Sequence, residues 1–333
     1  MIRAWRKKRY DFISIGDAVV DVFLSIQEAS VSCQLKREEC LLCLKYGEKI
    51  PLKSITRIPG AGNASNVAIG ASRLGWHSAI VSVLGNDEFA HEMRKHWEKE
   101  EVSCALVRVD RKHESSYNTI LHYKDERTIL SYHQPREYHM LDIDHAKWIY
   151  YTSLGKGHEA FEKHVLAHLH KNKEQHLSFN PGTFQLRRGL SSIKPVIARS
   201  NVFCVNKEEA QFLLKTKETD MKKLTHAFFQ IGAKIVIITD GTEGSYAYDG
   251  QDLWHCPIFP GECVERTGAG DSFALGFVFG LEETKSIAEA MRHGTANSWS
   301  VIQYVGPQKG LLTEEEMERV LKKFKKVQPR IVG

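Results

Sequence analysis

Short apolar segments alternate with longer amphipathic segments along most of the chain, which predicts strands followed by helices. The β-branched and apolar segments predicted as strands are 12–16, 19–26, 78–84, 105–109, 176–179, 202–205 and 234–239. The patterns predicted as helices are 63–74, 87–100, 158–171 and 207–214. Because strands and helices alternate, the sequence favours the α/β class, with a parallel sheet covered by helices on both faces.

Two pairs of extended segments interrupt this alternation. The segments 115–123 and 127–132 flank a polar turn and predict a hairpin, and 22–26 could pair with 51–58 beside it. Together, 22–58 and 115–132 predict a small β-sheet lid, with 29–49 as an irregular insertion in it. Since the chain shows no repeat and no low-complexity linker, we expect a single domain over 1–333 that carries this lid.

Charge and composition restrict the function only weakly. The chain has 333 residues, 42% of them hydrophobic and 26% charged, as in ordinary globular proteins. Its net charge of +5, from 46 basic and 41 acidic residues, suggests attraction to anionic small molecules at most. Basic clusters at 3–9 and 322–326 lack an accompanying nucleic-acid motif, so we expect solvated surfaces and no nucleic-acid partner.

Neither a signal peptide nor a membrane span is predicted. Asp11, Asp17 and Asp21 interrupt the apolar segment that follows the basic N-terminus. No apolar stretch approaches the roughly 20 residues that a spanning helix needs. We therefore expect no membrane partner and a soluble, cytoplasmic protein.

The seven cysteines predict reduced thiols, because their number is odd and no secretion signal precedes them. Cys40 and Cys43 have the spacing of half a zinc site, and Cys33 lies nearby. No fourth ligand is evident close by in the sequence. The sequence favours three thiols in a loop-rich insertion over a metal site.

The segment Thr267 to Phe273, Thr-Gly-Ala-Gly-Asp-Ser-Phe, carries the strongest chemical signal. Its glycines allow close approach to a ligand, and the small, apolar residues after it predict a helix starting at about Asp271. Backbone N–H groups at such a helix start favour anions, so we expect a phosphate to bind here. Asp271 could also be a simple N-cap of that helix.

A second glycine-containing segment, Pro59 to Asn66, also leads into a predicted helix. Ser65 replaces the third glycine of a dinucleotide fingerprint, and no apolar strand directly precedes the segment. Gly155 and Lys156 lack the upstream glycine of a Walker A motif. Rossmann and P-loop enzymes are therefore weak alternatives.

Five segments in order resemble the motifs of the PfkB/ribokinase family of carbohydrate and nucleoside kinases. The first signature is similar to Gly62–Ala68 with 73–75 and 84–87, and the second is similar to 267–273. The family's intermediate motifs are similar to 180–182, 206–209 and 239–244. The resemblance covers nearly the whole chain. It implies a ribokinase-like three-layer α/β/α sandwich with a β lid, beneath which ATP and a sugar-like alcohol bind end to end.

The same resemblance implies roles for individual residues. It implies Asp271 as the base that activates the acceptor hydroxyl, with an anion hole formed by the backbone of Gly268, Ala269 and Gly270. The residues implied for the acceptor are Asp21, Gly62, Asn63 and Asn66. The implied ligands of Mg²⁺, held through water, are Asn206 and Glu209. Those implied for ATP are Asn180, Asn206, Thr239, Gly241, Gly244, Thr267 and, near adenine, Asn297.

Structural alternatives stand beside these roles. Asn206 could cap the helix that starts at Lys207, with Glu209 in its first turn. Asn180 could be a turn residue, and Asp21 a solvated strand residue. The ordered co-occurrence of the motifs favours the functional interpretation.

This chain departs from the family pattern at two places. Ala61-Gly62 replaces a common Gly-Gly, and Glu265-Arg266 stands where many members have an aspartate and a threonine. That aspartate helps to hold a monovalent cation in ribokinase-like members, so the resemblance does not imply potassium activation here.

The resulting hypothesis is an ATP-dependent kinase acting on a hydroxyl of a ribose- or fructose-like sugar. The alternatives are a nucleoside (adenosine-like) kinase of the same fold and a catalytically silent regulator that binds sugar or nucleotide. A phosphosugar acceptor would need a further cationic pocket, for which Arg127 and Arg136 are candidates. We expect a homodimer through the lid, because an exposed sheet invites pairing.

Overall fold

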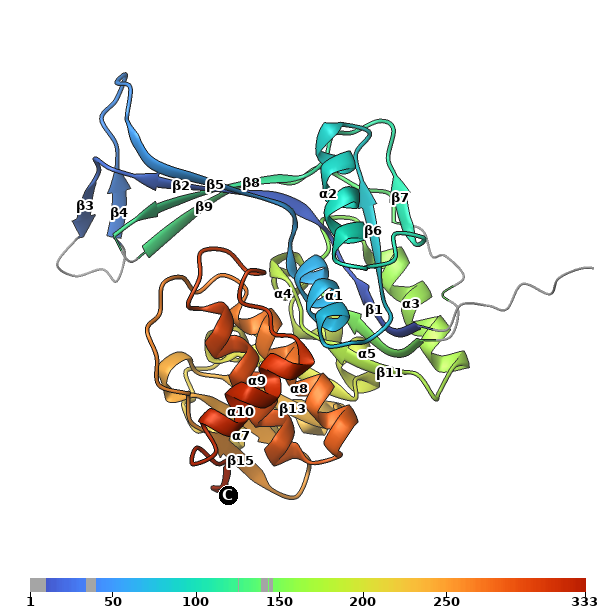
Figure 1. Ribbon diagram of the computed structural model, residues 1–333. Helices are drawn as coiled ribbons and strands as arrows, with labels where there is room; N and C mark the ends of the chain where they lie inside the picture. Colours follow the sequence, from blue (N-terminus) through green and yellow to red (C-terminus); the bar gives the residue numbers. More distant parts are fainter. Residues whose placement is uncertain (1–9, 34–39, 125, 139–142, 144–145) are drawn as a thin grey trace, which may run out of the picture.

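A computed structural model describes residues 10–33, 40–124, 126–138, 143 and 146–333. The predicted α/β class and three-layer arrangement are confirmed: one large sheet has helices on both faces, and a separate small sheet extends from it (Figure 1). No described helix is long and apolar enough to cross a membrane.

Over the described residues the large sheet has ten strands, and its middle is parallel. Its order is β16 (Arg330–Ile331), β15 (Leu253–Cys256), β14 (Ser245–Tyr248), β13 (Ile235–Thr239), β12 (Val202–Asn206), β11 (His176–Phe179), β10 (Ala146–Tyr151), β1 (Tyr10–Ile15), β6 (Ser78–Leu84) and β7 (Val107–Val109). The seven neighbouring strands β13, β12, β11, β10, β1, β6 and β7 run parallel. Strands β14, β15 and β16 form an antiparallel edge. Because the carboxyl ends of the parallel strands meet at one edge, loops from distant parts of the chain converge there.

Alternating strand residues supply the two cores. Ile13 and Ile149 face one core, which is covered by α3 (Glu159–Lys171), α4 (Thr183–Arg187), α5 (Leu190–Arg199), α6 (Lys207–Leu214) and α7 (Met221–Ile231). Phe12 and Tyr150 face the other, which is covered by α1 (Asn63–Arg73), α2 (Glu88–Lys99), α8 (Ala269–Thr284), α9 (Ile287–Val301) and α10 (Glu314–Lys323). The strands are therefore buried on both sides, as parallel strands must be.

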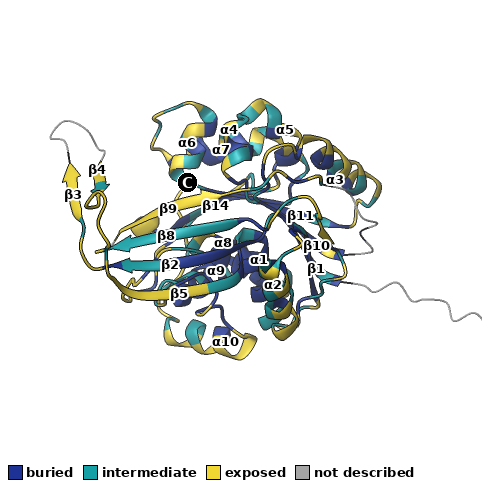
Figure 2. Cartoon of the chain, turned by 90° about the horizontal axis from the view of Figure 1, so that it is seen from above, coloured by how far each residue is buried: buried dark blue, intermediate teal, exposed yellow. Residues whose placement is uncertain are grey.

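The segments expected to form the lid make a four-stranded sheet. Its order is β5 (Leu52–Ala61), β2 (Val19–Ile26), β8 (Tyr117–Tyr123) and β9 (Glu126–Tyr132). In Figure 2 the outer lid strands β5 and β9 are largely exposed and β8 is intermediate, whereas β2 is mostly buried. The strands of the large sheet are covered on both faces. The lid, in contrast, contacts the body through one face and where its strands connect to the body.

The expectation of an irregular insertion at 29–49 is wrong. The described part contains two paired antiparallel strands, β3 (Ser30–Cys33) and β4 (Cys40–Cys43). Their register places Cys33 directly opposite Cys40, with Cα atoms 4.2 Å apart, and the two form a disulfide. The expectation of reduced thiols is therefore wrong for this pair, because strand pairing brings two cysteines together that are seven positions apart.

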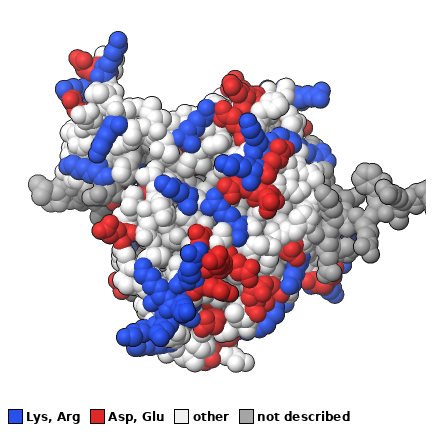
Figure 3. All heavy atoms as spheres, viewed as in Figure 1, with Lys and Arg blue, Asp and Glu red and all other residues white. Residues whose placement is uncertain are grey.

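Cys43 is free, and the described residues contain no group of three or more His, Cys, Asp or Glu side chains that could hold a metal ion. The zinc alternative thus finds no support in the described part of the chain. Lys322, Lys323, Lys325 and Lys326 are exposed at the end of α10, as expected for a solvated face. On the face seen in Figure 3, basic and acidic side chains are both present, and a basic group at the lower left lies beside an acidic one.

Candidate active site

Three residues that are predicted to bind the nucleotide lie at the carboxyl ends of neighbouring parallel strands. Asn180 comes directly after β11, Asn206 ends β12 and Thr239 ends β13. Asn206 and Thr239 are paired in the register, and the amide of Asn180 donates to the carbonyl of Cys204 at 2.8 Å. The sheet therefore brings these three residues to one edge, where ligands of open α/β sheets bind.

Asp271 lies at the start of α8, but it is not the N-cap. That position belongs to Gly268, whose φ of 82° is left-handed and suits glycine. Asp271 is the third residue of the helix, so the interpretation as an N-cap is wrong. The helix begins two residues earlier than expected, because Ala269 and Gly270 are already helical.

The carboxylate of Asp271 is buried, with 8% of the residue exposed. Its Oδ2 accepts a hydrogen bond from Nδ2 of Asn66, at 2.9 Å. Burial raises the pKa of Asp271 to about 6; the bond from Asn66 lowers it, and the negative charges of Glu209 and Asp21 raise it. A buried carboxylate with a pKa near neutrality is well suited to accept a proton.

The first turn of α8 is open beside this carboxylate. Gly270 is exposed, and a Cβ atom built on it would meet no atom within 4 Å. The N–H of Ala269 already donates to the carbonyl of Arg266, at 3.2 Å. The N–H groups of Gly270 and Asp271 remain available in the way typical of a helix start.

Asn66 is oriented by a residue that the sequence did not reveal. Nε2 of Gln308 donates to Oδ1 of Asn66 at 3.1 Å and to the carbonyl of Gly60 at 2.8 Å. Oε1 of Gln308 in turn accepts from Nε2 of His96, at 2.8 Å. With its Oδ1 engaged, Asn66 presents its NH₂ group to Asp271. Gln308 is 242 positions from Asn66, and no local pattern connects the two.

The acceptor side is built where β2 enters the lid. Asp21 is 6% exposed, and its Oδ1 accepts from Nδ2 of Asn118 in β8, at 2.9 Å. Burial raises the pKa of Asp21 to about 6; Asn118 lowers it and Glu265 raises it. Asp21 is therefore not a solvated strand residue. The sequence missed Asn118, which the parallel register places beside Asp21.

Gly62 and Asn63 begin α1 next to this region. Gly62 is the N-cap with φ 95°, and a Cβ atom there would lie 2.8 Å from the carbonyl oxygen of Asp17. Only glycine therefore fits this turn. Asn63 is half-buried at the first helical position.

Asn206 and Glu209 form a complete capping box at the start of α6. Oδ1 of Asn206 accepts from the N–H of Glu209 at 2.8 Å, and Oε2 of Glu209 accepts from the N–H of Asn206 at 2.9 Å. The capping interpretation is thus confirmed. Burial raises the pKa of Glu209; the bond from Asn206 lowers it, and the charge of Glu208 raises it. Amide and carboxylate oxygens are the type of ligand that Mg²⁺ prefers, so the residues fit that ion.

The predicted nucleotide loop is a tight turn. Gly241 and Gly244 have φ values of 51° and 89° around a short 3₁₀ turn, Gly241–Glu243. Gly241 is exposed with open space beside it. Nζ of Lys207 forms an ion pair with Asp240 at 2.8 Å. This positively charged side chain at the same edge was not predicted from the sequence.

Asn297 has a different environment. It is fully buried, its Nδ2 donates to the carbonyl of Ser272 at 2.8 Å, and its Oδ1 accepts from the N–H of Leu312 at 3.2 Å. Both ends of its amide therefore hold α9 against its neighbours. These contacts give Asn297 a packing role and no support for an adenine contact.

Two arginines considered for an anionic acceptor are paired with acidic residues. Arg136 is buried and contacts Asp110 at 3.3 Å. Arg127 of the lid contacts Oε1 of Glu265 at 3.0 Å, and the N–H and hydroxyl of Thr267 donate to the same oxygen at 2.8 and 2.6 Å.

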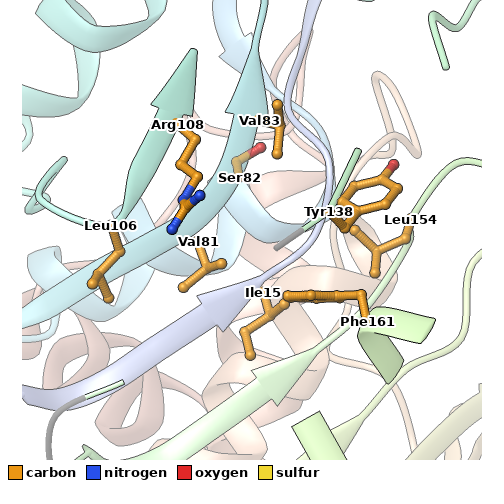
Figure 4. A pocket seen from close by; sticks show the side chains of 9 residues that line it. All are labelled: Ile15, Val81, Ser82, Val83, Leu106, Arg108, Tyr138, Leu154 and Phe161. Carbon is orange, nitrogen blue, oxygen red and sulfur yellow. The ribbon is translucent and has the colours of Figure 1, made fainter. Parts of the chain in front are cut away.

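A largely apolar pocket lies elsewhere, around the ends of β1 and β6 (Figure 4). Its lining includes Arg108 and Tyr138 but none of the residues expected to bind ATP or the acceptor. The hydroxyl of Tyr138 contacts both carboxylate oxygens of Asp17 at 2.9 Å. The candidate catalytic and binding residues therefore lie at the strand ends below the lid, and not in this pocket.

Known proteins are similar to this chain in sequence and in fold over most of its length. Over most of its length the chain is 25% identical to an ATP-dependent 6-phosphofructokinase of Thermoanaerobacterium thermosaccharolyticum, covering 90% of each protein. It is 22% identical to a 5-dehydro-2-deoxygluconokinase of Bacillus subtilis, covering 95% of this chain and 97% of the relative.

The fold is similar to that of an Arabidopsis thaliana ribokinase complexed with ribose and ATP, with a TM-score of 0.77, 18% identity and coverage of 95% and 99%. A Burkholderia thailandensis nucleoside kinase in complex with inosine gives 0.74, 17% identity and coverage of 94% and 99%. The family model for pfkB family carbohydrate kinases matches residues 23–314. The chain belongs to the pfkB family of carbohydrate kinases.

Proposed function

We propose that this sugar kinase transfers the γ-phosphate of ATP to a hydroxyl of a ribose- or fructose-like sugar, with Asp271 as the general base. The observation that carries the proposal is the buried carboxylate of Asp271, held by Asn66 beside the open first turn of α8. A carboxylate there can accept the hydroxyl proton as the oxygen–phosphorus bond forms.

The surrounding residues would position and neutralise the reacting groups. N–H groups at the start of α8 would face the transferred phosphoryl group, and Asp21 would accept hydrogen bonds from acceptor hydroxyls. Asn180, Thr239, Gly241 and Gly244 would line the ATP site. Asn206 and Glu209 would hold Mg²⁺ through water, and the ion would neutralise phosphate charge.

A panel of acceptors tests the substrate class. Purified protein is incubated with ATP, Mg²⁺ and free sugars, sugar acids, sugar phosphates or nucleosides, and ADP release is measured. We expect the highest kcat/KM with a free sugar. Preference for a nucleoside would replace this proposal with the nucleoside alternative, and absence of turnover with every acceptor would favour a silent binding protein.

We also propose that two copies associate through the outer face of the lid. The register puts Leu24, Ile55 and Leu130 on the face opposite to Asp21, and Ile55 and Leu130 are 64% and 53% exposed. An apolar sheet face of this kind favours pairing with a second sheet. Light scattering should show a dimer at micromolar concentration; a monomer would contradict the proposal. The cytoplasmic location stays a prediction.

A further inference from the structure

Two ion pairs join the lid to the body among the described residues, and they lie on opposite faces of the lid sheet. Arg57 of β5 contacts Glu92 of α2 at 2.5 Å. Arg127 of β9 contacts Glu265 at 3.0 Å. In the register, Arg57 shares a face with Val22, whereas Arg127 is paired with His122 on the face that carries Asp21. Arg127 thus belongs to the face of the lid that is turned toward the site.

The two partners of the inner ion pair differ in their surroundings. The side chain of Arg127 is 33% exposed, but that of Glu265 is only 3% exposed. Oε2 of Glu265 is buried and has no hydrogen-bond partner among the described residues. The buried negative charge is therefore compensated through Oε1 alone, where Arg127 supplies the positive charge. Removal of one partner from such a pair leaves an uncompensated buried charge.

The oxygen that contacts Arg127 also fixes the loop before α8. The N–H and the hydroxyl of Thr267 both donate to Oε1 of Glu265. Thr267 directly precedes Gly268, the left-handed N-cap, and the helix carries Asp271 three residues later. A rigid helix start transmits a shift of this loop to both the outward N–H groups and the carboxylate.

We propose that Arg127 is a positioning residue: through Glu265 and Thr267, it couples the closed lid to the start of α8. This inference rests on the proposed function. Arg127 neutralises Glu265 when the lid lies over the site, and this stabilises the loop geometry that Gly268 to Asp271 require. When the lid opens, the guanidinium leaves and the loop loses its charged partner. The lid then controls the phosphate-binding turn as well as access of the acceptor.

A different role for Arg127 would be direct contact with an anionic acceptor, and a double-mutant cycle separates the two roles. The variants are Arg127→Ala, Glu265→Gln and their combination. Glutamine keeps an oxygen for Thr267 but removes the charge. Arg57→Ala is the matched control, because it breaks a lid–body ion pair on the opposite face. Arg127→Lys retains the charge without the planar guanidinium.

We expect Arg127→Ala to lower kcat about tenfold to a hundredfold, with a smaller change in the KM of the acceptor. In the Glu265→Gln background, the same substitution should change kcat less than about threefold, because the partner charge is already gone. Arg127→Lys should recover part of the lost turnover, and Arg57→Ala should leave kcat unchanged. Equal losses in both backgrounds, or a loss confined to acceptor KM, would overturn the proposal.

Hydrogen exchange on the same proteins gives a readout that needs no turnover. Arg127→Ala should speed amide exchange over 265–271, whereas Arg57→Ala should not. Unchanged exchange in this segment would refute the coupling even if activity fell. If the wild-type protein phosphorylates no acceptor, the proposed function fails, but the exchange result still decides whether Arg127 orders this loop.

Discussion

The two halves of the active site are held in different ways. On the body, α1 and α8 approach so closely that a Cβ atom on Gly70 would lie 2.3 Å from a methyl group of Leu275. Asn66 and Asp271 project from these two helices and meet at 2.9 Å. Close packing allows few alternative positions, so the position of the Asp271 carboxylate is fixed by the core.

On the lid, positions depend on strand register and on individual polar contacts. Asp21 and Asn118 are neighbours through β2 and β8, and Arg127 reaches Glu265 from the outermost strand. All seven residues of β9 are exposed. We therefore expect substitutions in the body to change the chemical step. Substitutions in the lid should change how the lid is coupled to that step.

The largest effect is expected from Asp271→Asn, which removes the proposed base from the fixed half. Turnover should fall roughly two to four orders of magnitude, while ATP affinity and the fold persist. Measurement of kcat, ATP binding and thermal unfolding of one preparation tests this. Near-normal turnover would remove Asp271 from the mechanism.

The same variant should be more stable than the wild type at pH 7. The pKa of Asp271 is raised from 3.8 to about 6, so the folded state binds its proton more tightly than the unfolded state. Its contribution to stability is present below pH 3.8 and is lost as the pH rises through about 6. The gain in Tm from Asp271→Asn should therefore shrink between pH 7 and pH 5. A constant difference would contradict the raised pKa.

Glu209→Gln tests the metal role against the capping role. Glutamine can occupy the third position of a capping box, so stability should change little. Loss of the carboxylate should weaken Mg²⁺ affinity about tenfold to a hundredfold, measured as the Mg²⁺ concentration that gives half-maximal turnover. Glu316→Gln is the matched control, because Thr313 and Glu316 form the same capping box in α10. A similar Mg²⁺ requirement in both variants would leave Glu209 a capping residue only.

A smaller effect is expected from pH on the wild-type enzyme. Asp21 and Asp271 both have pKa values raised to about 6, mainly by burial. As the proposed base, Asp271 must be ionised, so kcat/KM should fall below about pH 6, and protonation of Asp21 should steepen the decline. A profile that stays flat down to pH 5 would contradict this assignment.

Much of the fold was predictable because its signals are local. The predicted limits of the segments 78–84, 176–179 and 207–214 coincide with β6, β11 and α6. Strand β10 and helices α4, α5 and α7 were not predicted from the sequence. Strand β10 is a short apolar run, Trp148 to Tyr151, that is buried on both faces, and periodicity alone does not distinguish such a run from a buried helix segment. Tertiary pairing between β1 and β11 decides its conformation.

The residues of the candidate site also divide into some that were predictable from local motifs and some that were not. The ordered motifs pointed to Asp271, Asn66 and Asp21, which the structure brings close enough for their charges and hydrogen bonds to interact. Gln308 and Asn118 were not predictable, because their roles arise from contacts between elements far apart in the sequence. The disulfide was missed for a similar reason, since it depends on the pairing of β3 with β4.

The smallest expected effect concerns monovalent cations, and it follows from Glu265. Its Oε1 already accepts from Thr267 and contacts Arg127. A cation at this carboxylate would have to lie beside the positively charged guanidinium, which opposes its binding. Replacing sodium with potassium should therefore change kcat and KM only slightly. The Arg127→Ala variant removes that positive charge and leaves the buried carboxylate without its partner. Any potassium response should therefore be larger in this variant than in the wild type. A large, saturable activation of the wild type by potassium would show that a cation binds beside Glu265 while Arg127 is present, and would contradict the expected repulsion by the guanidinium.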